Sequence, residues 1–120
     1  MKEESLRQRR VSRLLRDALG PILAEELGLE SSGLVSVTRV EVPADLRLAR
    51  VYLSFFGLPD PSSAVAFLES RTGMIRRRLA STVELKYNPQ LFFRLDPSAA
   101  DVERIDRLLD ASRKNDRNRD

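Results

Sequence analysis

Hydrophobic positions near the start of the chain recur at the spacing of one helical face and predict a helix over residues 5–27. The apolar side chains on this face are Val11, Leu14, Leu15, Ala18, Ile22 and Leu23. Gly20 and Pro21 interrupt the pattern. Because a proline inside a helix removes a backbone donor and crowds the preceding turn, we expect a kink or a break there.

A pair of strands is predicted next. Residues 34–42 are rich in β-branched side chains, which favour strands, and their alternation changes phase between Val37 and Val40. Such a phase change is typical of a β-bulge. After the turn residues 43–45, apolar and polar side chains alternate cleanly over residues 49–56. The short connection between the two strands predicts an antiparallel hairpin with one buried face.

A second helical pattern covers residues 63–83, where Ser62 or Ser63 can cap the helix, and a strand is predicted over residues 91–95. Gly73 lies in the middle of the helical pattern, where glycine costs about 1 kcal/mol relative to alanine. We therefore expect a kink at Gly73 between two shorter helices. The predicted fold class is α+β, with the order α-β-β-α-kink-α-β and helices on one face of a three-stranded sheet.

The length of the chain, 120 residues, suits one domain, which we place over residues 1–97. Apolar side chains at helical spacing predict a short C-terminal helix within residues 98–111. Residues 112–120 are charged and lack apolar side chains, so we expect this tail to be disordered. No window is long and apolar enough for a membrane span, and no secretory signal is recognisable, so we expect a soluble cytoplasmic protein.

The composition excludes most catalytic machinery. The chain contains no cysteine and no histidine, which removes thiolate chemistry, the commonest metal ligand and every Ser-His-Asp arrangement. Its five glycines are scattered and form no phosphate-binding loop. The adjacent Glu25 and Glu26 diverge around a helix, and we interpret them as part of a solvated face. We therefore expect no enzymatic activity, no metal and no cofactor.

Positive charge is concentrated in two clusters, and all but three of the 21 basic residues are arginines, whose planar fork suits phosphate. The candidate RNA-binding residues are Arg7, Arg9, Arg10, Arg13 and Arg16 in the first helix, and Arg76, Arg77, Arg78 and Lys86 further along. No acidic residue lies between Arg71 and Ala80, so the second cluster looks uncompensated, as on polyanion-binding surfaces. Solvated helix faces and a GC-rich genome also favour arginine, so charge alone leaves both interpretations open.

Short motifs follow one another in a specific order over roughly residues 7–96. They are Arg7-x-x-Arg10-Val11 in the first helix, Val40 and Asp45-Leu46-x-x-Ala49-x-Val51-Tyr52 in the hairpin, Gly73-x-Ile75-Arg76 with Leu79 in the second helical region, and Pro89-x-Leu91-x-Phe93-x-x-Asp96 at the third strand. Together they resemble the ribosome-binding factor A family of bacterial small-subunit maturation proteins. The kink differs, because the family usually has Ala-x-Gly where this chain has Arg71-Thr72-Gly73.

The resemblance implies a KH-like fold of type II topology, with a helix–kink–helix in place of the GxxG loop. It also implies binding to the free 30S subunit and its 16S rRNA late in assembly, with links to cold adaptation and with small-subunit ribosomal proteins as further candidate partners. We expect a monomer that acts without catalysis.

Two alternatives stay open from the residues themselves. One is a generic KH-like module that binds single-stranded nucleic acid, for which the aromatic candidates on strands or loops are Tyr52, Phe56, Tyr87 and Phe92. The other is a protein–protein adaptor whose arginines meet acidic partners. Sedimentation with free 30S subunits would separate both from a ribosome-binding factor.

Overall fold

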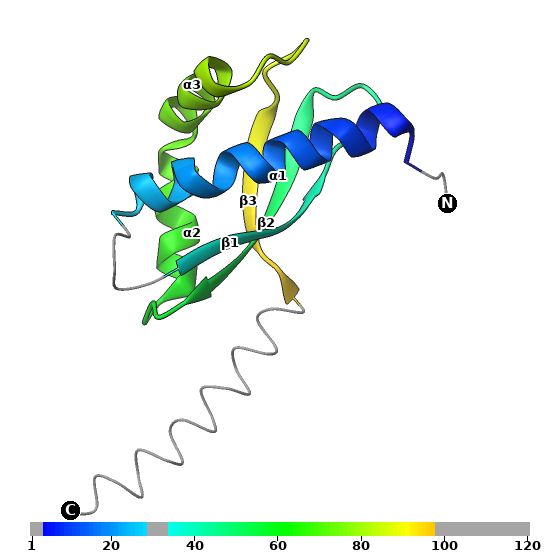
Figure 1. Ribbon diagram of the computed structural model, residues 1–120. Helices are drawn as coiled ribbons and strands as arrows, with labels where there is room; N and C mark the ends of the chain where they lie inside the picture. Colours follow the sequence, from blue (N-terminus) through cyan, green and yellow to red (C-terminus); the bar gives the residue numbers. More distant parts are fainter. Residues whose placement is uncertain (1–3, 29–33, 98–120) are drawn as a thin grey trace, which may run out of the picture.

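Six helices and strands follow one another in the predicted order in a computed structural model, which describes residues 4–28 and 34–97 (Figure 1). The elements are α1 (Leu6–Glu26), β1 (Leu34–Glu41), β2 (Leu48–Phe56), α2 (Pro61–Ser70), α3 (Thr72–Thr82) and β3 (Gln90–Leu95). The α+β class is therefore confirmed. The helix predicted within residues 98–111 and the tail at residues 112–120 lie outside the described residues.

The sheet has three strands in the order β1-β2-β3. β1 and β2 form the predicted antiparallel hairpin, and β3 adds to the other side of β2 in parallel. The register between β1 and β2 shifts between Val37 and Arg39, which confirms the predicted bulge. Because of this extra residue, Val37 and Val40 both point to the core although they are three positions apart.

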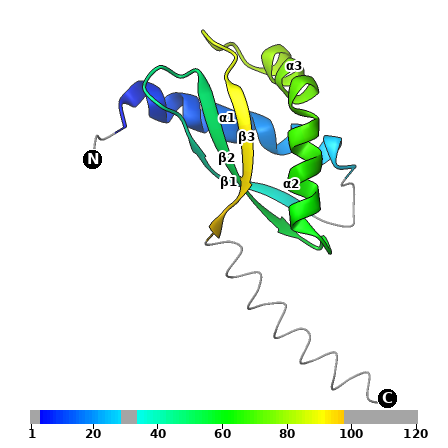
Figure 2. The same ribbon diagram turned by 180° about the vertical axis from the view of Figure 1, so that it is seen from behind.

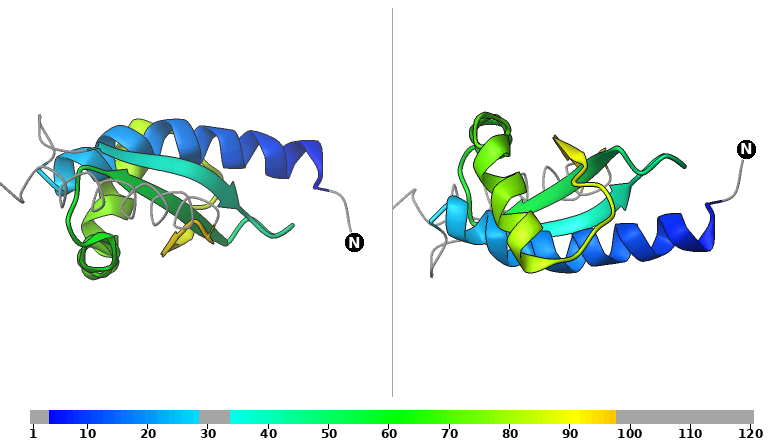
Figure 3. Two further views of the ribbon diagram at one scale, coloured as in Figure 1. Left: turned by 90° about the horizontal axis from the view of Figure 1, so that it is seen from below. Right: turned by 90° about the horizontal axis from the view of Figure 1, so that it is seen from above.

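One face of the sheet is buried beneath the helices. In β2 every second side chain, from Ala49 to Phe55, is buried, and Leu91 and Phe93 extend this layer into β3. α1 crosses the strands on this side, and the view from behind places the strands in front of it (Figures 1 and 2). α2 lies beside β3 at the edge of the sheet (Figure 2), and the views from below and from above show α1 along one side of the strands (Figure 3). All buried apolar side chains join a single core.

α1 begins with a capping box, in which the Ser5 hydroxyl accepts from the Gln8 backbone and the Gln8 side chain accepts from the Ser5 backbone. The helix then runs through Pro21 as one element, so the predicted break is wrong. Pro21 is exposed, while the next two residues are buried, so core packing holds the helix together across the missing donor. The helical face is also shifted slightly, because Leu14 is exposed and Leu19 is buried.

The second helical region consists of two helices, as predicted, but the junction lies at Arg71. Gly73 is the second residue of α3, has no positive φ, and an added Cβ there would meet no atom within 4 Å. The expectation that Gly73 itself forms the kink is therefore wrong, since its lack of a side chain is not used for any close approach. α2 starts at Pro61 rather than after the serines, and Asp60 caps it by accepting from the backbone of Ser63.

Within residues 4–28 and 34–97, no helix combines the length and the apolar character needed to cross a bilayer.

Candidate nucleic-acid interface

The predicted arginine cluster of α1 lies on the solvent side of that helix. All five of its members, Arg7, Arg9, Arg10, Arg13 and Arg16, are exposed. Their spacing explains this, because the buried side chains Leu15, Leu19 and Leu23 occupy the opposite stripe of the helix. Helical phase places Arg9, Arg13 and Arg16 opposite the apolar stripe, as the structure has them, and puts Arg7 and Arg10 nearer its edge, although both are exposed as well.

A groove of about 530 Å³ runs between α1 and β1. Its arginine lining consists of Arg9, Arg10, Arg13 and Arg16 from α1 and Arg39 from β1. Glu4 is the one acidic residue among the described residues that line it. Because four arginines of α1 and one of β1 line it, the groove is suited to bind a polyanion.

Few intramolecular contacts occupy these arginines. Arg9 donates to the backbone oxygen of Glu4 at 3.5 Å, and Arg16 Nε lies 3.8 Å from an oxygen of the exposed Asp17. Such exposed pairs contribute little to stability, so neither arginine is needed for the fold. Arg10 and Arg13 have no ion-pair partner among the residues that the structure describes. The guanidinium groups are therefore available to a ligand.

Arg39 is the member of the groove that sequence analysis missed. It follows the bulge in β1, and its register partner is Tyr52 in β2. Its guanidinium carbon lies 4.2 Å from the centroid of the Tyr52 ring, and its Nε lies 3.6 Å from an oxygen of Glu41. The phase change that predicted the bulge was the available signal, since the extra residue there sets which face of the strand Arg39 occupies.

The three arginines of the second cluster that lie in α3 do not form one exposed stripe. Arg77 is exposed, as predicted, and has no ion-pair partner in the described parts of the chain. Arg76 instead donates to the backbone oxygens of Pro89 at 2.9 Å and Asn88 at 2.7 Å. These two bonds tie α3 to the segment that leads into β3. Arg76 therefore has a structural role whether or not it also meets a ligand.

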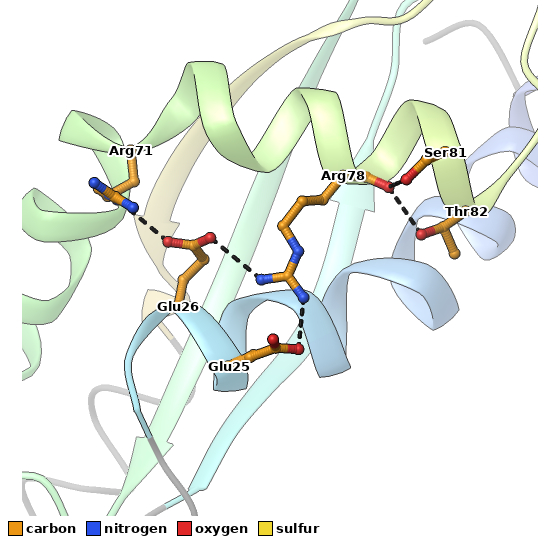
Figure 4. A network of polar contacts seen from close by, with 6 residues as sticks. All are labelled: Glu25, Glu26, Arg71, Arg78, Ser81 and Thr82. Carbon is orange, nitrogen blue, oxygen red and sulfur yellow. Dashed lines mark hydrogen bonds and ion pairs between the residues drawn. The ribbon is translucent and has the colours of Figure 1, made fainter.

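Arg78 joins a network of ion pairs between α1 and α3, which Figure 4 shows from close by. Its two terminal nitrogens donate to Glu25 Oε2 at 2.5 Å and to Glu26 Oε1 at 3.2 Å. Arg71 Nε donates to the other oxygen of Glu26 at 3.2 Å. The hydrogen bond to Glu25, together with that to Glu26, raises the pKa of Arg78 above its usual value.

Two expectations are therefore wrong. The second cluster is compensated in part, because Arg78 pairs with two carboxylates of α1, while Arg77 has no ion-pair partner among the described residues. The pair Glu25 and Glu26 is not simply a solvated face, because the Glu26 side chain is only 7% exposed. The two carboxylates diverge on α1, but the long Arg78 side chain reaches both from α3 (Figure 4).

Lys86 lies in the connection between α3 and β3, apart from the arginine groove. Its Nζ is 5.5 Å from the centroid of the Tyr87 ring, and the guanidinium carbon of Arg47 is 5.1 Å from the same ring. The three side chains line a second hollow of about 550 Å³ at the end of the sheet where β2 and β3 begin. The predicted site residues thus divide among three places.

Among the described residues, no group of three or more acidic side chains is arranged to hold a metal ion. An α+β domain with exposed guanidinium groups converging on a groove has the features of a basic, KH-like nucleic-acid-binding domain. The family model described as Ribosome-binding factor A matches residues 7–109. The chain belongs to this family.

Curated relatives support the same assignment. The chain is 40% identical over 106 residues to Ribosome-binding factor A of Thermomicrobium roseum, an alignment that covers 88% of this chain and 82% of the relative. It is 37% identical over 113 residues to Ribosome-binding factor A of Pelodictyon phaeoclathratiforme, covering 92% of this chain and 94% of that protein.

Solved structures agree with the fold. The crystal structure of ribosome-binding factor A from Thermus thermophilus superposes with a TM-score of 0.61 at 20% identity, covering 73% of this chain and 94% of that one. A homology model of the Thermus thermophilus factor, fitted into the cryo-EM map of a 30S–RbfA complex, superposes with a TM-score of 0.54 at 26% identity. That alignment covers 71% of this chain and 94% of the other.

Proposed function

We propose that this protein binds the free 30S ribosomal subunit through its 16S rRNA and assists the late maturation of that subunit. It acts in the cytoplasm as a monomer, and its contribution is binding rather than catalysis. Its activity matters most at low temperature. Small-subunit ribosomal proteins are candidate additional contacts.

The observation that carries the proposal is the α1–β1 groove, which is lined by arginines of both elements. Exposed arginines that serve only solubility are usually mixed with acidic side chains, whereas this groove is lined by Arg9, Arg10, Arg13, Arg16 and Arg39 against Glu4. Phosphates are the ligands that such an arrangement fits. A relative in this family has been fitted into the map of a 30S complex, which supports the ribosomal subunit as the source of those phosphates.

The proposal is tested by co-sedimentation of the protein with purified 30S and 70S particles. We expect the parent chain to migrate with free 30S subunits and not with 70S ribosomes. The variant carrying both Arg13→Glu and Arg77→Glu should bind 30S at least tenfold more weakly, because it places carboxylates against phosphates. Its melting temperature should stay near that of the parent, since both side chains are exposed.

A control for net charge carries Ser62→Glu and Ala66→Glu, which add two negative charges at exposed positions of α2. Its charge-matched counterpart carries Arg13→Gln and Arg77→Gln, which remove two positive charges. The α2 control should bind 30S like the parent, whereas the counterpart should bind more weakly. If the two variants lose binding to the same degree, net charge rather than the arginine surface governs the interaction. Full 30S binding by a folded double reversal would move the interface away from α1 and α3.

A further inference from the structure

The face of the sheet turned away from the helices carries arginines and aromatic rings side by side. At one level of the sheet, Arg39 of β1 pairs with Tyr52 of β2, and Tyr52 pairs with Arg94 of β3. The ring therefore has a guanidinium-bearing residue on each neighbouring strand. Since successive strands lie about 4.8 Å apart, all three side chains fall within the footprint of one or two nucleotides.

The next level of the same face repeats the combination. Here Glu41 of β1 pairs with Arg50 of β2, and Arg50 pairs with Phe92 of β3. Phe92 is 39% exposed, although it is a large apolar side chain in a regular strand. Tyr52 and Phe92 are diagonal neighbours, one strand and two residues apart, which places them roughly 8 Å from each other. Phe92 thus presents a flat ring to solvent, and the half-buried Tyr52 ring lies beside it under the Arg39 guanidinium, at a spacing that lets each position accept a separate base.

The Tyr52 ring is held in place before any ligand binds. The Tyr52 hydroxyl donates to Glu41 Oε1 at 3.0 Å, and the Arg39 guanidinium carbon lies 4.2 Å from the ring centroid. The Arg39 side chain is 51% exposed, so the outer side of its guanidinium plane is open to a second stacking partner. Bases stack on guanidinium planes as well as on aromatic rings. Little ordering of side chains is then needed when a base arrives.

The acidic groups on this face are already engaged. Glu41 accepts from Tyr52 and lies 3.6 Å from Arg39, as described above. Asp96, just beyond the end of β3, is 9% exposed and accepts from the Thr38 hydroxyl at 2.5 Å. Arg50 and Arg94 are exposed and have no ion-pair partner among residues 4–28 and 34–97. The face therefore offers two free positive charges beside its two rings.

We propose that this open face binds a short stretch of unpaired RNA. One base stacks on Phe92 and another on the Tyr52–Arg39 pair, while Arg50 and Arg94 meet the phosphates. Arg39 also lines the α1–β1 groove, so the same strand can continue into that groove with its backbone. Aromatic rings between unpaired arginines favour nucleic acid over an acidic peptide, because carboxylates pair with arginine but do not stack on rings. This proposal rests on the proposed function and adds the class of RNA that is recognised.

The proposal is tested by fluorescence anisotropy with a labelled eight-nucleotide single-stranded RNA and with a duplex of the same length. The parent chain should bind the single strand at least tenfold more tightly. Phe92→Ala should weaken single-strand binding about 5- to 100-fold, the range for loss of one stacked base. Phe67→Ala is the matched control, because Phe67 is 44% exposed but belongs to α2 and not to the sheet. This control should bind like the parent.

Two more variants separate stacking from folding. Phe92→Tyr should bind RNA with near-parent affinity, because it keeps a flat ring. Phe92→Leu should bind as weakly as Phe92→Ala, although leucine is apolar and is tolerated in a strand. Circular dichroism melts identify any variant that fails to fold. An equal loss of RNA affinity in Phe67→Ala and Phe92→Ala would overturn the proposal, and so would parent-like affinity of Phe92→Leu. So would preference for the duplex, or displacement of the RNA by polyglutamate at equal charge.

The outcomes distinguish this inference from the proposed function. If Arg13→Glu with Arg77→Glu abolishes co-sedimentation with 30S while Phe92→Ala leaves RNA binding unchanged, the ribosomal role stands and the sheet face is not an RNA site. If Phe92→Ala loses single-stranded RNA but the parent chain does not sediment with 30S, the face binds RNA and the ribosomal role is wrong.

Discussion

Arg77 and Arg78 are adjacent in α3 but have opposite surroundings. Arg78 pairs with both Glu25 and Glu26, whereas Arg77 is exposed and has no ion-pair partner in the described residues. Arg78→Ala should lower the melting temperature clearly, because it removes one of the two guanidinium groups that hold the buried Glu26 carboxylate. Arg77→Ala should melt like the parent and lose affinity for the 30S subunit instead. Thermal melts beside co-sedimentation measure both effects.

A lower melting temperature for Arg77→Ala than for Arg78→Ala would contradict this prediction. It would mean that the ion-pair network does not stabilise the contact between α1 and α3. Arg78→Lys is a useful third variant, since one ammonium group cannot reach both carboxylates in the forked geometry of Figure 4. It should therefore fall between Arg78→Ala and the parent.

Gly73 gives a second test at the scale of one residue. It lies inside α3 with open space around its Cα and no positive φ, so Gly73→Ala should stabilise the protein by about 0.4–1 kcal/mol. Gly28 also has open space around it, but its φ is +67°. Gly28→Ala should therefore destabilise by about 1–2 kcal/mol, since a Cβ is strained in the left-handed region. Denaturant titrations of both variants give the comparison, and destabilisation by Gly73→Ala would restore a structural role for that glycine.

Individual residues were predictable from the sequence only where their surroundings depend on local periodicity. The exposure of Arg13 and the burial of Leu15 follow from helical phase, and both are confirmed. The environments of Glu26 and Arg78 were not predictable, because their pairing joins positions 52 residues apart in the chain. Such contacts depend on how two helices cross, which no local pattern records.

At the scale of elements, α1 is notable for continuing through an exposed proline. Pro21→Ala supplies a backbone donor and removes the steric clash with the preceding turn, so it should raise the free energy of unfolding by about 1–3 kcal/mol. Chemical denaturation measures this gain. An unchanged or lower stability would mean that the bend which proline imposes is needed to fit α1 to the sheet.

The order of the elements was predicted correctly because each has a strong pattern of its own. The bulge in β1 was also visible, since Val37 and Val40 cannot share one face of an uninterrupted strand. The helix junction was placed two residues late, at Gly73 instead of Arg71. Glycine disfavours a helix by propensity, but propensity is a weak guide that the tertiary surroundings of a residue override.

At the scale of the whole molecule, the arginine groove and the sheet face should produce a steep salt dependence. Each phosphate contact on single-stranded RNA contributes about −0.7 to the slope of log affinity against log salt concentration. Arg10→Gln and Arg13→Gln should each make the slope shallower by about this amount if both guanidinium groups meet phosphates. Phe92→Ala should weaken binding at every salt concentration without changing the slope, because stacking releases no counterions.

The measurement is a set of anisotropy titrations between low and physiological salt. If the plots of log affinity against log salt concentration have the parent's slope for all three variants, Arg10 and Arg13 do not contact phosphates. A shallower slope for Phe92→Ala would mean that this ring positions a neighbouring arginine instead of stacking on a base.

The parallel pairing of β3 with β2 also has a consequence for how the chain folds. β1 and β2 are neighbours in sequence and can pair early, but Leu48 meets Gln90 only after the helices between them have been placed. Until then the hairpin lacks Leu91 and Phe93, which belong to its buried layer, and two-stranded sheets are marginally stable in water. During synthesis, the native sheet therefore stays incomplete until the segment through Leu95 has left the exit tunnel, so we expect the domain to acquire its stability only after that segment has emerged.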